Sequence, residues 1–555
     1  MLSKDSAVFP YEQEAWNRVG TQPQTSLSAA QQGPRWEVIA LVLTCLLLLA
    51  IRWRLRDMPF ERDEGEYAYA GQLMLQGIPP YQMAYNMKLP GTYAAYASIM
   101  AIAGQTDSGV RLGLMFVNLL TIFAVYGIGK RIYGSKAGSV AAISYGLLSI
   151  GPWVHGFAGH ATHFVVLFAI IGTLTLLHAL ERQRLWEIFA AGLLFGVAFL
   201  MKQPGAAFGL FAVFYLAQRS KWLGGGFSDS ARRLAVLILG MVLPFVLTCA
   251  LLWHAGVFAK FWFWTFSYAY QYGTNLGWRG GWRFFSRNFT KAALSAIPLW
   301  TLAGIGISSF LWDRKARVCA AFLLGLLFFS GIALSAGLYF RPHYFILLLP
   351  SISLLVGLAV NSAARFFPHD SILARCVPAL AFSIACAATL AEEAKFFFQA
   401  DPISASRYVY PEDPFPECRA IGLYIQRNLP PSATMAMFGS EPQIMFYARR
   451  HSVTGYLYGY SLTEEQKYAS IMQRELIGEI ESARPDLIVQ VEDWDLRPGT
   501  DRSVFAWFSQ YITESYSMLE VLRKNDDLQI RPEDEIRRAP GNLEGAILLY
   551  VRRRF

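Results

Sequence analysis

The 555-residue sequence contains few charged residues: Asp, Glu, Lys and Arg make up 16% of it, whereas hydrophobic residues make up 54%. Soluble globular chains carry about 25% charged residues, so this composition argues against an ordinary soluble protein. Long apolar runs recur through the first 395 residues, as in chains that cross a membrane several times. The net charge of +9 does not indicate nucleic-acid binding, because most Lys and Arg lie in short loops between these runs.

Several motifs are also missing. The six cysteines form no Cys-x-x-Cys pair and five of them lie in apolar runs, which predicts buried small side chains and no disulfide framework. Walker A, dinucleotide-binding and Ser-nucleophile motifs are absent. Residues 1–35 are polar and the first apolar run begins at Trp36, so we expect an N-terminal tail and no cleavable signal.

The apolar runs predict a polytopic α-helical membrane protein with about eleven transmembrane helices. Several runs are shorter than the ~20 residues that a straight span needs. The predicted spans are residues 36–53, 109–129, 136–154, 163–180, 186–201, 204–218, 234–254, 291–312, 317–338, 344–361 and 373–392. Between the fifth and sixth, the segment MKQPG could be a tight turn or a kink in one long helix, because Pro204 permits either.

The positive charges in the short loops predict the orientation. With the N-terminus inside, the inner loops hold most of these Lys and Arg, and the short outer turns hold only Lys202 and Arg341. The positive-inside rule therefore favours a cytoplasmic tail in a multi-pass protein of the cell inner membrane. Three arginines follow the first span on the outer side and favour the opposite orientation: Arg52, Arg54 and Arg56. We give more weight to the total positive charge of the many short loops.

This topology places two long loops and the C-terminal part outside. The membrane domain, residues 36–395, has outer loops at 54–108 and 255–290, and the second is rich in aromatics, which predicts amphipathic helices at the interface. From residue 396 charges increase, so residues 396–555 predict a soluble extracytoplasmic α/β domain. Its expected elements are strands at 433–439, 486–491 and 545–551 and a helix at 461–483.

Four carboxylates stand directly after the first span, in PFERDEGEYAYAG. One interpretation is a solvated loop beside the membrane. The other is a general base, because a carboxylate within hydrogen-bond reach of a hydroxyl can take its proton. We favour Asp63 as the base with Glu64 as its helper, and expect Glu61 and Glu66 to be solvated neighbours. In a helix, Asp63, Glu66 and Tyr67 would share one face.

Cations stand at the ends of apolar runs on the same outer side. Lys88 lies in NMKLPGTYAAYA, Lys202 in FLMKQPGAAF, and Arg341 with His343 in GLYFRPHYFILLLP. Charges at such positions are costly unless they are paired or functional. Three cations that converge on one cavity would bind an anion such as phosphate. The alternative for each is a side chain that reaches out to lipid headgroups.

Histidines are concentrated before the fourth span, in WVHGFAGHATHF. His160 and His163 are three residues apart, a spacing that could serve a metal ion if acidic partners came from another loop. We favour His160 as a polar residue of a pocket.

The order of these motifs resembles the C-type glycosyltransferases, in the branch of dolichyl-phosphate-mannose–protein mannosyltransferases and bacterial aminoarabinose-transferase-like proteins. Asp-Glu after the first span is followed by Lys-x-Pro, by the acidic-to-Arg link GQTDSGVRLGLM, by Lys-Gln-Pro after a span and by RPHY before an apolar helix. The resemblance covers roughly residues 36–395. The C-terminal domain matches only in general design.

The resemblance implies a membrane enzyme that moves a sugar from a polyprenyl phosphate to an acceptor on the outer face, with inversion. The implied site residues are Asp63 and Glu64 in catalysis, Lys88, Lys202, Arg341, His343 and Tyr344 at the donor phosphate, and Asp107, His160 and Tyr67 in the acceptor site or pocket. Met87 stands where some relatives carry an acidic metal ligand, and Leu89 where the family often has Pro. A divalent cation on Asp63 with Glu64 or Asp107 is left open.

The chemistry of a lipid-linked donor is consistent with these residues. Charge grows on the leaving phosphate as the sugar bond breaks, and fixed cations would stabilise it. Expected partners are the polyprenyl-phosphate-linked donor, membrane lipids and an acceptor that could be a glycan, a lipid or a protein. The alternative is a multi-span transporter or a flippase for lipid-linked sugars, which would not need a folded outer domain. The absence of an internal repeat weakens a transporter built from duplicated halves.

Overall fold

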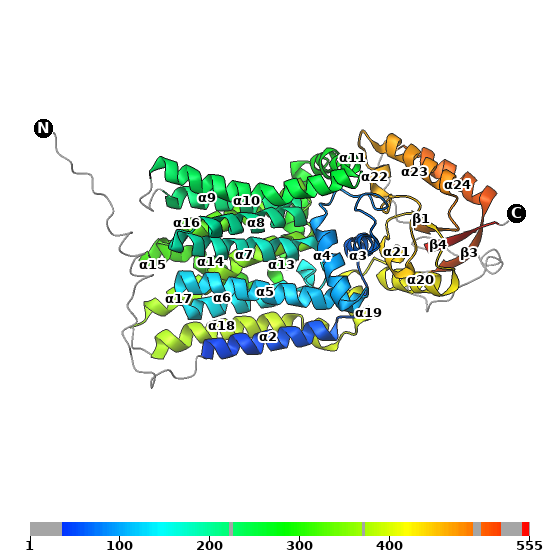
Figure 1. Ribbon diagram of the computed structural model, residues 1–555. Coiled ribbons are helices and arrows are strands. Elements are labelled where there is room, and N and C mark those ends of the chain that lie inside the picture. Colours follow the sequence, from blue (N-terminus) through cyan, green and yellow to red (C-terminus); the bar gives the residue numbers. More distant parts are fainter. Residues whose placement is uncertain (1–35, 221–225, 369–371, 492–500, 523–546, 554–555) are drawn as a thin grey trace.

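The computed structural model describes residues 36–220, 226–368, 372–491, 501–522 and 547–553. A bundle of long helices forms one part of the molecule, and a smaller domain with a β-sheet forms the other (Figure 1). The expected N-terminal tail lies outside the described residues. The division into a helical body and a C-terminal α/β part agrees with the predicted fold class.

Each predicted span contains a helix, but 291–312 crosses the break between two helices and 344–361 begins in a 3-10 turn. In chain order the helices of the body are α2 (Trp36–Arg54), α5 (Asp107–Tyr133), α6 (Ser135–Ser149), α7 (Ala161–Arg182), α8 (Leu185–Met201), α9 (Ala206–Ser220), α10 (Phe227–His254), α14 (Ile297–Trp312), α16 (Ala320–Leu334), α17 (Leu349–Ala363) and α18 (Ile372–Glu392). A short 3-10 turn, η3 (Gln203–Gly205), separates α8 from α9, and these two helices contact each other. The MKQPG segment is therefore a turn and not a kink.

Within the described ranges, five helices are long and apolar enough to cross a membrane: α2, α5, α7, α10 and the segment Leu349–Phe366. A sixth is added if α13 (Trp278–Leu294) and α14, which meet at a 103° bend, are counted as one broken span. α8 and α16 are apolar but shorter. The multi-span character is confirmed, and the number eleven stays a prediction.

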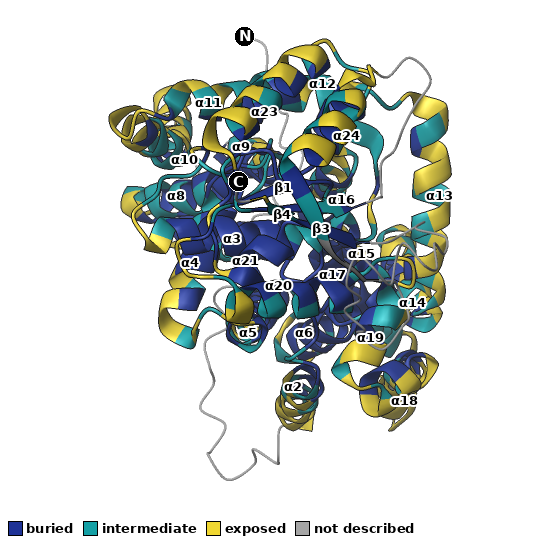
Figure 2. Cartoon of the chain, turned by 90° about the vertical axis from the view of Figure 1, so that its right-hand side faces the viewer, coloured by how far each residue is buried: buried dark blue, intermediate teal, exposed yellow. Residues whose placement is uncertain are grey.

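The exposed surfaces of the helices match a body that is surrounded by lipid. The apolar window of α7 is 72% buried inside the protein, whereas that of α10 is only 11% buried. α10 exposes large apolar side chains such as Leu239, Leu247 and Leu251. Exposed residues also mark α2, α13 and α18 at the periphery (Figure 2). Peripheral helices with apolar exposed faces are expected where lipid replaces water.

Short helices collect at the end of the bundle that faces the C-terminal domain (Figure 1). They include α3 (Arg62–Leu75), α4 (Gly91–Ala103) and α11 (Phe258–Trp262). The π-helix η4 (Phe263–Tyr268), α12 (Ala269–Thr274) and the longer α13 follow α11 in the chain. The two predicted outer loops thus fold into helices. Their position at the membrane interface stays a prediction.

The C-terminal domain contains a four-stranded sheet in the order β1-β2-β4-β3. β1 and β2 are parallel, and β4 is antiparallel to both β2 and β3. The elements are α19 (Pro402–Val409), α20 (Phe415–Asn428), β1 (Met435–Phe438), α21 (Gln443–Ala448), α22 (Tyr460–Thr463), α23 (Ala469–Ala483), β2 (Leu487–Val491), α24 (Ser503–Ser515), β3 (Tyr516–Leu522) and β4 (Ile547–Arg552). The three predicted strands are present. β3 was not predicted, and the single helix expected over 461–483 is broken in two.

Helix α3 connects the two parts of the molecule. It begins with a capping box, in which the side chains of Glu61 and Glu64 each accept the backbone N–H of the other. Its flank packs tightly against α21, because a Cβ on Gly65 would lie 2.3 Å from the Cβ of Gln443. The N–H of Phe60 also donates to the Tyr447 hydroxyl at 2.9 Å. The acidic stretch is therefore buried between bundle and domain.

Candidate active site

Lys88 stands at the centre of the acidic cluster. Its ammonium donates to Asp63 Oδ1 at 2.6 Å and to Glu66 Oε2 at 2.5 Å. It also lies over the Tyr67 ring, 4.6 Å from the centroid. Helix α3 presents these three partners on one face, as their spacing predicts. A single cation from the next loop thus bridges two carboxylates.

Glu61 and Glu66 are not the solvated neighbours that the sequence suggested. Glu61 is 7% exposed and Glu66 is 1% exposed. The Tyr93 hydroxyl donates to Glu66 Oε1 at 2.5 Å. Burial raises the pKa of both carboxyls, and the nearby Asp63 raises them further. The expectation failed because the C-terminal domain covers this surface, which a local sequence pattern does not reveal.

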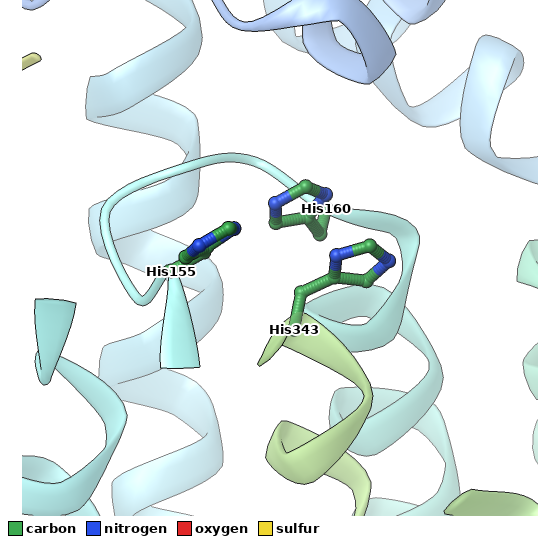
Figure 3. Close-up of side chains that lie close together, drawn as sticks. All are labelled: His155, His160 and His343. Atoms are coloured by element: carbon green, nitrogen blue, oxygen red, sulfur yellow. The ribbon is translucent and has the colours of Figure 1, made fainter. Parts of the chain in front are cut away.

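The histidines of two loops meet beside this cluster (Figure 3). His160 is the N-cap residue of α7, and its ring stacks on His343 of the turn η6 (Pro342–Leu347), with centroids 3.8 Å apart. His160 Nδ1 lies 3.7 Å from a Glu61 oxygen and 3.8 Å from an Asp63 oxygen. His155 completes the group, 5.9 Å from His160 between ring centroids. The group of histidines therefore adjoins the carboxylates.

Lys202 and Arg341 line the other side. The Lys202 ammonium lies 3.5 Å from His343 Nε2 and over the Tyr344 ring, 4.1 Å from its centroid. The exposed Arg341 donates to the Tyr272 hydroxyl at 3.1 Å. Among the residues that the structure describes, no carboxylate forms a salt bridge with either cation. These cations are therefore available to an anion from outside the chain.

The electrostatics of the cluster keep Asp63 ionised. Burial by itself raises the pKa of Asp63, but the charge of Lys88 outweighs this effect and holds the pKa well below its usual range. For Lys202, burial together with the charges of Lys88 and Arg341 outweighs the attraction of Asp63 and lowers the pKa to about 7. Burial lowers the pKa of His160 and His343 well below the ordinary value.

Two predicted site residues lie outside this cluster. Glu64 is fully buried and forms a two-pronged ion pair with Arg111, and the Gly159 N–H donates to it at 2.5 Å. Asp107 accepts from Tyr447 at 2.5 Å and pairs with Arg419 at 3.1 Å. Both carboxylates are already satisfied, so the structure gives no support to a divalent cation shared by Asp63 with either of them.

Sequence reasoning missed the contribution of the C-terminal domain. The Tyr458 hydroxyl lies 3.4 Å from Asp63 Oδ1, and the Lys88 ammonium lies 5.5 Å from the Tyr458 ring centroid. No motif marks Tyr458, but a run of tyrosines in GYLYGY is a signal that could have been used.

Two sets of described residues have metal-ligand spacing. They are the three histidines 155, 160 and 343, and Glu61 with Asp63 and His160. In each set the ligand atoms lie within 4.8 Å of one another. Imidazole and carboxylate are ordinary ligands of Zn²⁺. The arrangement thus brings a carboxylate, two cations without a carboxylate partner among the described residues, and potential metal-ligating groups into one partly buried place.

A family model described as dolichyl-phosphate-mannose-protein mannosyltransferase matches residues 88–253, which contain Lys88, Asp107, His160 and Lys202. No curated protein matches the chain. The solved structure of ArnT from Cupriavidus metallidurans bound to undecaprenyl phosphate is similar over 93% of this chain and 98% of that chain, with a TM-score of 0.60 and 14% identity. The chain has the C-type glycosyltransferase fold.

A second solved structure agrees with this fold. The archaeal oligosaccharyltransferase AglB from Archaeoglobus fulgidus, in complex with an inhibitory peptide and a dolichol-phosphate, is 13% identical with a TM-score of 0.54. The match covers 82% of this chain and 69% of that chain. The resemblance inferred from the sequence is confirmed, and the description of the matched family supports the prediction of a glycosyltransferase.

Proposed function

We propose that this chain transfers a sugar from a polyprenyl-phosphate-linked donor to an acceptor at the outer face of the membrane, with inversion. One observation carries the proposal: the half-buried carboxylate of Asp63 and three cations, two of which have no carboxylate partner among the described residues, lie where the helical bundle joins the C-terminal domain. The similar ArnT structure contains undecaprenyl phosphate, a lipid of the proposed class.

Lys202, Arg341 and Lys88 would hold the donor phosphate. As the bond from sugar to phosphate breaks, negative charge grows on the phosphate oxygens, and fixed cations stabilise the transition state more than the ground state. Tyr344 positions Lys202, because the ammonium lies over its ring. His343 contacts the same ammonium and completes this wall.

Asp63 would accept the proton of the acceptor hydroxyl. In the present arrangement its pairing with Lys88 makes it a weak base, because the ammonium stabilises the ionised form. A donor phosphate would draw the Lys88 ammonium toward itself and weaken the pair with Asp63, while Glu66 keeps the lysine near. Donor binding thereby activates the base. A base and a leaving phosphate on opposite faces of the sugar give inversion.

The test is transfer by purified protein in nanodiscs that contain undecaprenyl-phosphate-linked sugars from a panel. Released undecaprenyl phosphate is measured by mass spectrometry. We expect Asp63→Asn to lower release at least about 100-fold, and the exposed Glu412→Gln to leave it unchanged. Full retention by Asp63→Asn contradicts the base assignment. Movement of the lipid-linked sugar across the bilayer without release of undecaprenyl phosphate would favour a flippase.

A further inference from the structure

The three histidines 155, 160 and 343 surround one small space. Figure 3 shows the rings arranged around it, two from the loop before α7 and one from η6. One ligand nitrogen from each lies within 4.8 Å of the others. His155 also adopts a left-handed backbone conformation, with φ 51° and ψ 42°. Such a conformation costs free energy in a non-glycine residue and is typical of functional sites.

Among the described residues, the ring nitrogens of His160 have no hydrogen-bond partner that would explain the burial of this side chain. The side chain is 2% exposed. A buried polar group without a partner costs free energy, so native proteins rarely leave one unpaired. A ligand that binds imidazole nitrogen would remove this cost.

The surroundings indicate which nitrogens are available. His160 Nδ1 faces Glu61 and Asp63 at 3.7 and 3.8 Å, which leaves Nε2 free. His343 Nε2 faces Lys202 at 3.5 Å, which leaves Nδ1 free. In metal sites the second nitrogen of a ligating histidine usually donates to a carboxylate, which orients the ring. His160 has such carboxylates on the correct side.

We infer that His155, His160 and His343 bind a zinc ion. Three neutral imidazoles are a common protein ligand set for Zn²⁺ and leave a fourth position open. Zinc–nitrogen bonds of about 2.0–2.1 Å in a tetrahedron require the nitrogens to approach one another, so binding opens the stack of His160 on His343. This inference is independent of the proposed transfer reaction, because it is tested by metal binding alone.

The experiment measures metal on the full-length protein in nanodiscs. After treatment with a chelator and gel filtration, Zn²⁺ is added and bound metal is quantified by mass spectrometry. We expect one Zn²⁺ per chain. The variants His155→Gln, His160→Gln and His343→Gln should each bind Zn²⁺ at least about 100-fold more weakly. Such a loss exceeds the effect of replacing a residue that only contacts a metal ligand. His451→Gln is the matched control, because this exposed histidine bonds to Gln76 far from the cluster in sequence.

Several outcomes overturn the inference. These are no stoichiometric binding to the wild type, or binding that survives all three substitutions. If Asp63→Asn abolishes zinc binding while His155→Gln and His343→Gln retain it, the ion is bound by the carboxylates with His160. If a variant does not fold, X-ray absorption of the zinc-loaded wild type decides, because it counts imidazole ligands. Fewer than three would refute the assignment.

Discussion

Removing the charge of Glu64 should destabilise the protein more than removing almost any surface carboxylate. Glu64 is 0% exposed and Arg111 is 3% exposed, and their two-pronged ion pair is sealed between α3 and α5. Glu64→Gln keeps the side-chain shape but leaves a buried guanidinium without its counter-charge. Breaking one partner of such a pair costs about 3–5 kcal/mol. We expect a thermal midpoint lower by roughly 5 °C or more, measured by fluorescence-detected size-exclusion chromatography.

The controls separate this buried pair from an ordinary one. Glu181→Gln breaks the pair with Arg131 at the surface of the bundle, and surface pairs contribute about 0–1 kcal/mol. The double variant Glu64→Leu/Arg111→Met removes both charges and should recover part of the loss. If Glu64→Gln leaves the thermal midpoint unchanged and abolishes sugar transfer, the structural role is refuted and Glu64 takes part in the reaction.

Three further outcomes follow from the contacts. Lys88→Met removes the cation that serves Asp63 and the donor phosphate, so transfer by correctly folded protein should fall at least about 100-fold in kcat; unchanged kcat would contradict this role. Gly65→Ala places a methyl against Gln443 and should lower stability by about 1–3 kcal/mol, seen as earlier proteolysis of the C-terminal domain, whereas equal resistance would show that α21 can shift. Tyr447→Phe leaves the Phe60 N–H without its acceptor and should lower the free energy of unfolding by about 1–3 kcal/mol. Thermal unfolding measures this loss, and an unchanged midpoint would contradict it.

The helices of the membrane body could be predicted because lipid imposes a simple rule. A chain in hydrocarbon must satisfy its backbone hydrogen bonds internally, so each apolar run becomes a helix. Strands β1, β2 and β4 were also predicted, since they are short apolar runs between polar segments. β3 was not predicted, because it pairs with β4, which lies about thirty residues later in the chain. Such pairing depends on contacts that a local sequence pattern does not contain.

The site was predictable in its residue types and not in its partners. Lys88 lies beside Asp63, in agreement with the expectation that the acid and the cations share one face. The stacking of His160 on His343 was not predicted. The capping box was overlooked, although the pattern Glu-x-x-Glu at the start of a helix can cap its backbone N–H groups. That role and the ion pair with Arg111, 47 residues away in sequence, occupy Glu64. Adjacent residues on a helix point in different directions, so Asp63 and Glu64 could not share one task.

The C-terminal domain is part of the site and not an appendage. Tyr458 donates to the carbonyl of Arg62 at 3.1 Å and approaches Asp63 at 3.4 Å, so the domain covers the start of α3 directly. Arg62 in turn bonds to Glu441 at 2.8 Å. In the proposed reaction, an acceptor hydroxyl would approach Asp63 beside Tyr458 and Lys88. The proposal therefore assigns acceptor selection to this domain and binding of the donor phosphate to the cations of the bundle.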